Sequence, residues 1–249
     1  MQRRSDPPPA SPRDVAPHYT LRTNARAKRI TLRVLPGQGL VVSAPPRVTR
    51  REIAAVVHEH RAWAWQALAE GEAALPAACR EWPPRQLDLA ALGCRVVVGF
   101  LPSGQVRNVA AAQAGTLLEL DTDPGDRIAV ASAVAAWLKP RARRHLVPRL
   151  AALAERHGFA YRRCAIRGQR TVWGSYSASG TLSLNYKLLF LPPELVDYVL
   201  MHELVHTRHL DHSARFWDLL ERCQPGARAR DRRLHSAARR VPPWLERAH

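Results

Sequence analysis

The sequence is poor in the residues that build cysteine-based sites and membrane spans. Only four of its 249 residues are cysteines, and no two of them have the CxxC spacing that predicts a zinc site or a redox pair. Single cysteines exclude a disulfide framework and favour free thiols in a reducing compartment. No run approaches about 18 apolar residues, so a transmembrane helix is not expected. We therefore expect a cytoplasmic protein that does not enter a membrane.

Lysine and acidic residues are also scarce beside arginine. Arginine and lysine together number 38, of which only three are lysines, against 21 acidic residues, and the formal net charge is +17. A chain this basic attracts phosphate polyanions in a salt-dependent way. Any binding of nucleic acid by the arginine-rich run 222–240 is expected to be non-specific and electrostatic. The alternative is a solvated surface whose arginines reflect the composition of a GC-rich genome.

Turn residues divide the chain into a leader and two domains. Residues 1–18 are rich in proline, lack an apolar signal-peptide segment, and are typical of a disordered leader. Asp123-Pro124-Gly125-Asp126 is a strong turn sequence. We therefore expect a small β-containing N-terminal domain at 19–123 and a second domain at 124–249, and the mixture of elements indicates the α+β class.

Alternating apolar residues and turn signals predict most elements of the first domain. Thr49 and Glu52 have the spacing of a capping box, which predicts a helix that ends near Gly71. The first two predicted strands are separated by a turn sequence and indicate a hairpin. The strands are expected at 29–35, 40–44, 95–100, 105–110 and 116–120.

The second domain combines long helices with a hairpin. A helical pattern runs over 127–157, and Pro140 and Pro148 are expected to kink or divide it. A strand at 161–167 follows, and then segments 172–176 and 181–188, which indicate a hairpin.

A helix that starts with Pro192-Pro193-Glu194 carries an apolar stripe into a histidine cluster, His202-Glu203-Leu204-Val205-His206. Residues four apart lie on one face of a helix, so His202 and His206 can reach a single ion. Glu203 sits beside them, where it can take a proton from an activated water rather than bind the metal. We expect one catalytic Zn²⁺ per chain, and the alternative is a polar helix face without a metal.

A catalytic zinc needs a third protein ligand, and the candidates are His209, His212 and Glu221. If the helix continued, His209 would lie about 10.5 Å along its axis from His202, on the same stripe. Three ligands in one stripe do not readily surround an ion. We therefore expect the helix to end near residues 209–211 and His212 to turn back onto the metal. Ser213 would then begin a new helix as its N-cap.

The residues around this motif resemble the YgjP-like family of bacterial metallopeptidases, which is related to WLM and SprT-like domains. The family usually has cysteine where this chain has Tyr176. The resemblance implies a zincin-like C-terminal domain and a small β-containing N-terminal domain. The matching segments besides the histidine motif are Asp211-His212-Ser213, Phe216-Trp217, residues 171–177, Leu184-Asn185-Tyr186 and residues 196–199.

Residues near the motif are candidates for contacting a substrate, although a structural role explains each of them as well. An extended peptide pairing with the edge strand 181–188 is a further possible mode of binding. A developing oxyanion has four candidate partners that the sequence does not distinguish, namely Arg170, Tyr176, Tyr186 and His209. The substrate-binding candidates are Trp173, Tyr176, Asn185 and Tyr186.

These features favour a zinc-dependent metallopeptidase that acts on a peptide or protein substrate. A metal-dependent nucleotide phosphohydrolase is an alternative, because abundant arginines can hold phosphates. The chain lacks a glycine-rich phosphate loop and a carboxylate cluster for Mg²⁺, which disfavours that alternative. A nucleic-acid-associated protease acting on DNA-bound proteins is a third hypothesis.

Overall fold

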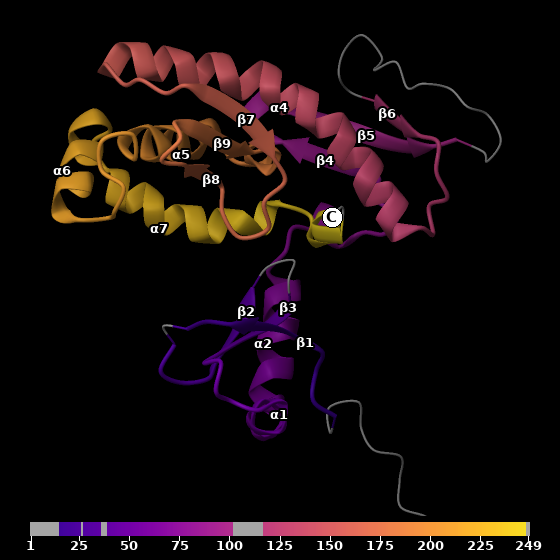
Figure 1. The fold of residues 1–249 in the computed structure, drawn as a ribbon. Helices are drawn as coiled ribbons and strands as arrows, with labels where there is room; N and C mark the ends of the chain where they lie inside the picture. The colour runs from indigo at the N-terminus through magenta and orange to yellow at the C-terminus, as the bar shows by residue number, and fades with distance from the viewer. Residues whose placement is uncertain (1–14, 26, 36–38, 102–116, 248–249) are drawn as a thin grey trace, which may run out of the picture. The chain divides into compact units, whose positions relative to one another are not determined.

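The computed structural model describes residues 15–25, 27–35, 39–101 and 117–247 and divides into two compact units, Met1–Leu75 and Pro76–His249 (Figure 1). The fold is α+β. Most of the predicted leader, the predicted turn at 36–38 and the predicted strand at 105–110 lie outside the described residues.

The N-terminal unit is a three-stranded sheet with two helices on one of its faces. Its strand order is β1-β3-β2, in which β3 (Gly39–Ala44) pairs parallel with β1 (Tyr19–Thr23) and antiparallel with β2 (Thr31–Leu35). The hairpin predicted from segments 29–35 and 40–44 is thus confirmed as β2 and β3. Helices α1 (Arg50–Glu59) and α2 (Arg61–Ala73) supply apolar side chains that pack against those of β3.

The predicted capping box begins α1. The backbone N–H of Thr49 donates to the Glu52 carboxylate at 2.7 Å, and the backbone N–H of Glu52 donates to the Thr49 hydroxyl at 3.2 Å. The single helix predicted from this box is divided at His60, which ends α1 and begins α2.

The boundary between the units lies at 75/76 rather than at the predicted 123/124. Strands β4 (Gln86–Leu89), β5 (Cys94–Phe100) and β6 (Leu117–Leu120) form a second sheet in the order β4-β5-β6. Their inward side chains share one hydrophobic core with helix α4 (Arg127–His157). Such short strands need a partner to cover their apolar face, and that partner lies beyond the predicted boundary.

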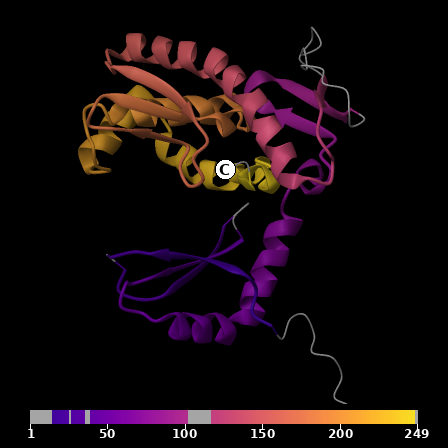
Figure 2. The ribbon, with the colours of Figure 1, turned by 45° about the vertical axis from the view of Figure 1, so that its right-hand side comes forward.

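Helix α4 is continuous over 31 residues and runs past both sheets of the C-terminal unit (Figures 1 and 2). The Asp126 carboxylate accepts hydrogen bonds from the first-turn amides of Ile128 and Ala129. Gly158 ends the helix in a left-handed conformation with φ of 66°. Pro140 and Pro148 do not divide it.

The third sheet carries the predicted hairpin. Strand β9 (Thr181–Asn185) lies between β7 (Arg163–Arg167), which is parallel to it, and β8 (Gly174–Tyr176), which is antiparallel. The short helix η2 (Tyr186–Phe190) replaces the predicted end of this strand. The edge strands are therefore β7 and β8, and β9 in the centre does not form the predicted edge.

Short helices complete the C-terminal unit. None of the helices in the described residues combines the length and apolar composition that a membrane crossing requires. The remaining elements are α3 (Ala77–Arg80), η1 (Ala90–Leu92), α5 (Pro193–Val205), α6 (Ala214–Cys223), α7 (Ala227–Ala237), η3 (Ala238–Arg240) and η4 (Pro243–Arg247).

A buried ion pair joins η2 to η4. Lys187 Nζ lies 2.6 Å from Glu246 Oε1, and the two side chains are 3% and 11% exposed. Removing one partner of such a pair costs about 3–5 kcal/mol, because the other charge stays buried without compensation. We expect Lys187→Met to lower the free energy of unfolding of the C-terminal unit by about that amount, measured by native-state hydrogen exchange of the α4 amides.

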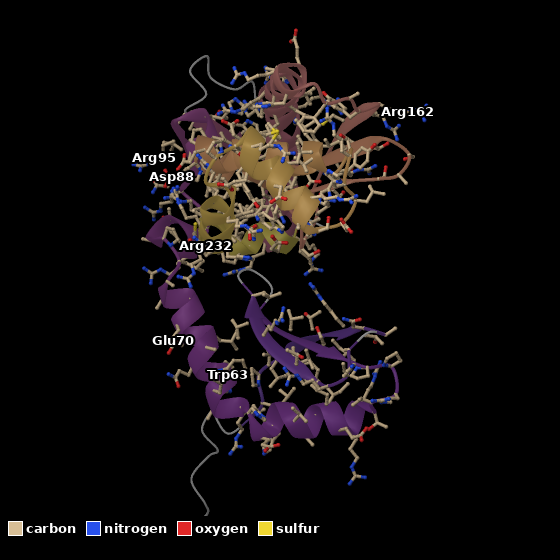
Figure 3. All side chains as sticks on the ribbon, turned by 90° about the vertical axis from the view of Figure 1, so that its left-hand side faces the viewer. Trp63, Glu70, Asp88, Arg95, Arg162 and Arg232 are labelled. Atoms are coloured by element: carbon tan, nitrogen blue, oxygen red, sulfur yellow. The ribbon has the colours of Figure 1, made fainter. Side chains whose placement is uncertain are left out.

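The exposed pair of Arg95 and Asp88 provides the control (Figure 3). Its atoms are 2.7 Å apart, yet the side chains are 65% and 50% exposed. Solvent screens such a pair, so Arg95→Met should leave the exchange rates close to those of the parent. Equal losses in the two variants would show that burial does not set the contribution of the Lys187 pair.

Candidate metal centre

Helix α5 places the first two histidines at its C-terminal end. Pro193 and Glu194 occupy its first turn, and nearly all the following side chains are buried. The helix ends at Val205, earlier than predicted, because the next amides bond three residues back: Thr207 N–H to Leu204 O and Arg208 N–H to Val205 O. This tighter turn leads the chain away from the helix axis.

The chain then brings His212 back to the other two imidazoles. His202 Nε2 lies 3.2 Å from His206 Nε2 and 3.0 Å from His212 Nε2. One ring nitrogen from each histidine lies within 4.8 Å of the others. Two nitrogens bound tetrahedrally to zinc at about 2.0–2.1 Å are about 3.3–3.4 Å apart. The donor set therefore fits an ion of this size.

Helix α6 packs against the three imidazole rings through Phe216. The Phe216 ring centroid lies 4.9, 4.7 and 4.8 Å from the rings of His202, His206 and His212, and Phe216 is fully buried. Ser213 is the N-cap of α6, as predicted, although its side chain makes no capping hydrogen bond. Phe216 thus packs against the three rings and limits where each can move.

Two residues that the sequence analysis missed fix the orientation of His202. The Tyr198 hydroxyl donates to Asp231 Oδ1 at 2.8 Å and lies 3.4 Å from His202 Nδ1. Burial, and then the hydrogen bond to Asp231, raise the pKa of Tyr198, so its hydroxyl stays protonated. It can therefore donate to Asp231 and accept from an N–H at His202 Nδ1. That tautomer leaves Nε2 of His202 free to bind a metal.

The other two candidate ligands have different partners. The backbone oxygen of His209, rather than its imidazole, contacts His206 Nδ1, at 2.9 Å. The Glu221 carboxylate accepts from the amides of Gly226 and Ala227, at 2.6 and 3.0 Å, where α7 begins. Of the three candidates, the structure brings only His212 to His202 and His206.

Glu203 lies beside the imidazoles in an enclosed position. It is 5% exposed, and in the described residues its Oε2 has no hydrogen-bond partner. Burial raises its pKa to about 8. A Cβ placed on Gly174 would lie 2.6 Å from both Cγ and Oε1 of Glu203, so the carboxylate packs directly on the backbone of β8.

This close approach makes Gly174 a positioning residue for Glu203. We expect Gly174→Ala to lower peptidase turnover about tenfold to a hundredfold, because a misplacement of about 1 Å can cost that much. The metal expected at the imidazoles should stay bound, since the three atoms nearest to the added Cβ all belong to Glu203. Kinetics and elemental analysis on one preparation measure both.

A glycine in another strand provides the control for Gly174. A Cβ on Gly99 would lie 3.8 Å from Glu119 Cγ, an ordinary contact. Gly99→Ala should therefore leave turnover unchanged. A Gly174→Ala enzyme with parental turnover would show that the carboxylate does not need this space.

An open cavity of about 410 Å³ lies in front of these groups. Its lining comes from residues 171–176, α5, the turn after it, and α7. Trp173 and Tyr176 line this cavity together with the three histidines and Glu203. Two of the four candidate substrate contacts are therefore next to the metal centre.

Asn185 and Tyr186, in contrast, do not line the cavity. Asn185 Nδ2 donates to the carbonyls of Gln169 and Val172, at 2.7 and 2.9 Å. Tyr186 is fully buried in the core. Asn185 thus holds the loop before β8 in place, and neither side chain is positioned to contact a substrate in this cavity.

The family match supports a metal-dependent peptidase. The model of the family described as "YgjP-like, metallopeptidase domain" matches residues 28–237, and the chain belongs to the YgjP-like family. Among solved structures it is similar to the "metallopeptidase zymogen of Pyrococcus abyssi abylysin", with 27% identity over 36% of this chain and 90% of that chain and a TM-score of 0.33. No curated protein matches the chain.

Proposed function

We propose that the chain is a zincin-like peptidase in which His202, His206 and His212 hold one Zn²⁺ and Glu203 is the general base. One observation carries this proposal. The buried carboxyl of Glu203, which has no described partner at Oε2, lies beside three converging imidazole nitrogens at an open cavity. A buried polar group without a partner in a cavity is a candidate for chemistry rather than stability.

The protonation states of these groups suit a bound dication. Burial, and then repulsion from the other two imidazoles, lower the pKa of His202 to about 3, and burial also lowers the pKa of His206. Both rings are therefore neutral at pH 7, and a neutral imidazole is the form that binds metal. A nearby positive ion also favours the carboxylate form of Glu203, which burial alone disfavours.

The ion and Glu203 have separate roles in the proposed reaction. When bound, Zn²⁺ supplies Lewis acidity, which makes a water molecule more acidic and polarises a scissile carbonyl. Glu203 takes the proton from that water and passes it to the leaving amine. Tyr198 and Asp231 keep His202 in one tautomer, because the Tyr198 hydroxyl donates to Asp231 and so accepts from His202 Nδ1.

The proposed substrate is an extended peptide or protein segment. Strand β8 is one of the two edges of its sheet and, unlike β7, lines the cavity beside Glu203, so a peptide can pair with its backbone. Trp173 and Tyr176 lie at the same edge and are proposed to contact substrate side chains. A strand of three residues spans about 10 Å, enough for about three residues of substrate.

The lining of the cavity disfavours the nucleotide phosphohydrolase. Among its described residues there is no arginine or lysine, and Asp231 contributes a carboxylate. A triphosphate would therefore meet no cationic side chain there besides the metal site itself. The protease that acts on DNA-bound proteins uses the same chemistry, and its distinguishing feature would be a separate surface for nucleic acid.

Removal and return of the metal tests the proposal. The purified chain is stripped with a chelator, reloaded with one equivalent of Zn²⁺, and assayed on unfolded casein and on nucleoside triphosphates. We expect hydrolysis of casein only after reloading, with no turnover of nucleotides. Nucleotide turnover without peptide cleavage would instead assign the site to the phosphohydrolase.

A further inference from the structure

The sheet of the N-terminal unit has one face turned away from its helices. Leu40 and Val42 of β3 pack with Ile53 and Val57 of the helices. Side chains alternate along a strand, so Val41 and Ser43 belong to the opposite face, where Val41 is only 3% exposed. In the register of β2 and β3, Ser43 pairs with Thr31, and Arg33 lies two residues further along β2. Polar and cationic residues thus surround Val41, the partner of Arg33, on the face that the helices do not cover.

A cavity of about 500 Å³ opens at this face. All its lining residues belong to the N-terminal unit, so its form does not depend on the other unit. Apart from Ala27 the lining is polar, and it consists of the cations Lys28, Arg29 and Arg33, the hydroxyls of Thr31 and Ser43, and the amide of Asn24.

The positive charge of this cavity has no balancing acid nearby in the sequence. No aspartate or glutamate occurs between Asp14 and Glu52. Lys28, Arg29 and Arg33 are exposed, and none of the ion pairs found in the described residues involves them. Three like charges that converge on one cavity repel each other, and a bound anion relieves this repulsion.

We propose that this cavity binds the phosphodiester backbone of nucleic acid. Lysine, arginine and hydroxyl groups are the usual donors to phosphate oxygens. The described lining has no aromatic ring on which a base can stack and no apolar cluster that can enter a bilayer. Recognition therefore concerns the backbone and is independent of base sequence.

The arginine-rich run 222–240 is the competing surface, and several of its side chains already have protein partners. Arg228 stacks on Trp217 at 4.6 Å, Arg230 donates to Pro225 O at 2.6 Å, and Arg233 pairs with Glu194 at 2.8 Å. The three cations of the N-terminal cavity have no such partners among the described residues. Other arginines of the run, such as Arg222, Arg232 and Arg239, are exposed but spread over α6, α7 and η3, whereas the three cations line one cavity, and this convergence favours the cavity as the principal site.

The test compares two variants that each remove three charges from the full-length chain. Lys28→Gln/Arg29→Gln/Arg33→Gln neutralises the cavity. Arg222→Gln/Arg232→Gln/Arg239→Gln neutralises exposed arginines of the run, of which Arg232 is labelled in Figure 3. Fluorescence anisotropy measures the binding of each variant to a labelled DNA duplex of about 20 base pairs and to a single strand of equal length. The salt concentration is raised from about 50 to about 200 mM.

We expect the cavity variant to bind the duplex at least about tenfold more weakly than the parent chain. The slope of log Kd against log salt concentration should fall by about one for each lost phosphate contact, hence by up to about three. The control variant should change both quantities much less. An equal loss in the two variants would overturn the proposal, as would a parent chain that binds neither DNA.

Two further measurements separate this inference from its alternatives. Vesicles that contain anionic lipid should not bind through the cavity, and vesicle binding that the cavity variant alone loses, with DNA binding unchanged, would assign the site to a membrane surface instead. Zinc content and casein hydrolysis should be the same in the cavity variant and the parent. The proposal can therefore fail while the peptidase assignment stands, and the reverse also holds.

Discussion

Replacing Glu203 by glutamine is expected to reduce peptide hydrolysis by at least about a hundredfold while the metal stays bound. Glutamine has nearly the same shape as glutamate but does not accept the proton that a general base must take, and that role contributes about 10²–10⁴-fold. The three imidazoles that hold the ion are unchanged. Turnover on casein and elemental analysis of the same sample measure the two quantities.

The surface residue Glu155 on α4 provides the matched control for Glu203→Gln. Glu155 is exposed, and its side chain makes none of the side-chain hydrogen bonds or ion pairs found in the described residues. Glu155→Gln should therefore keep both turnover and metal. If Glu203→Gln keeps parental turnover, another group is the base. If it loses the metal instead, Glu203 is a ligand.

The second large effect is expected at His212. Removing one of three protein ligands should weaken zinc binding strongly, so that His212→Ala loses its metal on dialysis against a mild chelator. His209→Ala removes an imidazole from the same turn, but only the backbone oxygen of His209 contacts His206, and the alanine variant keeps that oxygen. We expect His209→Ala to retain close to one equivalent of zinc.

The comparison of these two variants has clear contrary outcomes. Loss of zinc in His209→Ala alone would transfer the third-ligand role to that residue. Retention in both would mean that the ion is held by donors other than the three converging imidazoles. A cobalt-substituted sample provides a second readout, because its visible absorption depends on coordination number and should change in His212→Ala only.

The sequence predicted those helix ends that have a capping signal close to them in the chain. Asp126 and Gly158 bracket α4, and Thr49 with Glu52 begins α1, because capping groups act within a few residues of the helix end. The approach of His212 followed from the geometry of a single helix. His202 and His206 lie on one stripe of that helix, so the third donor had to come from a segment beyond the end of the helix.

The parts that the sequence did not predict depend on contacts distant along the chain. The boundary at 75/76 required knowing that β4, β5 and β6 pack with α4. Tyr198 was within reach of prediction, since it lies four residues before His202 on the same helix. Asp231 was not, because it arrives from α7, 33 residues after Tyr198.

The position of the three imidazoles within residues 202–212 has a consequence for the folding of the protein. A cross-link between residues so close in sequence restricts only a short loop, and the entropy of closing such a loop is small. The neighbouring core, including Phe216 and the buried side chains of α5, forms from apolar contacts that need no ion. Exchange of the proposed ion is therefore expected to be a local event, confined to the turn after α5, and the metal-free chain is expected to stay folded.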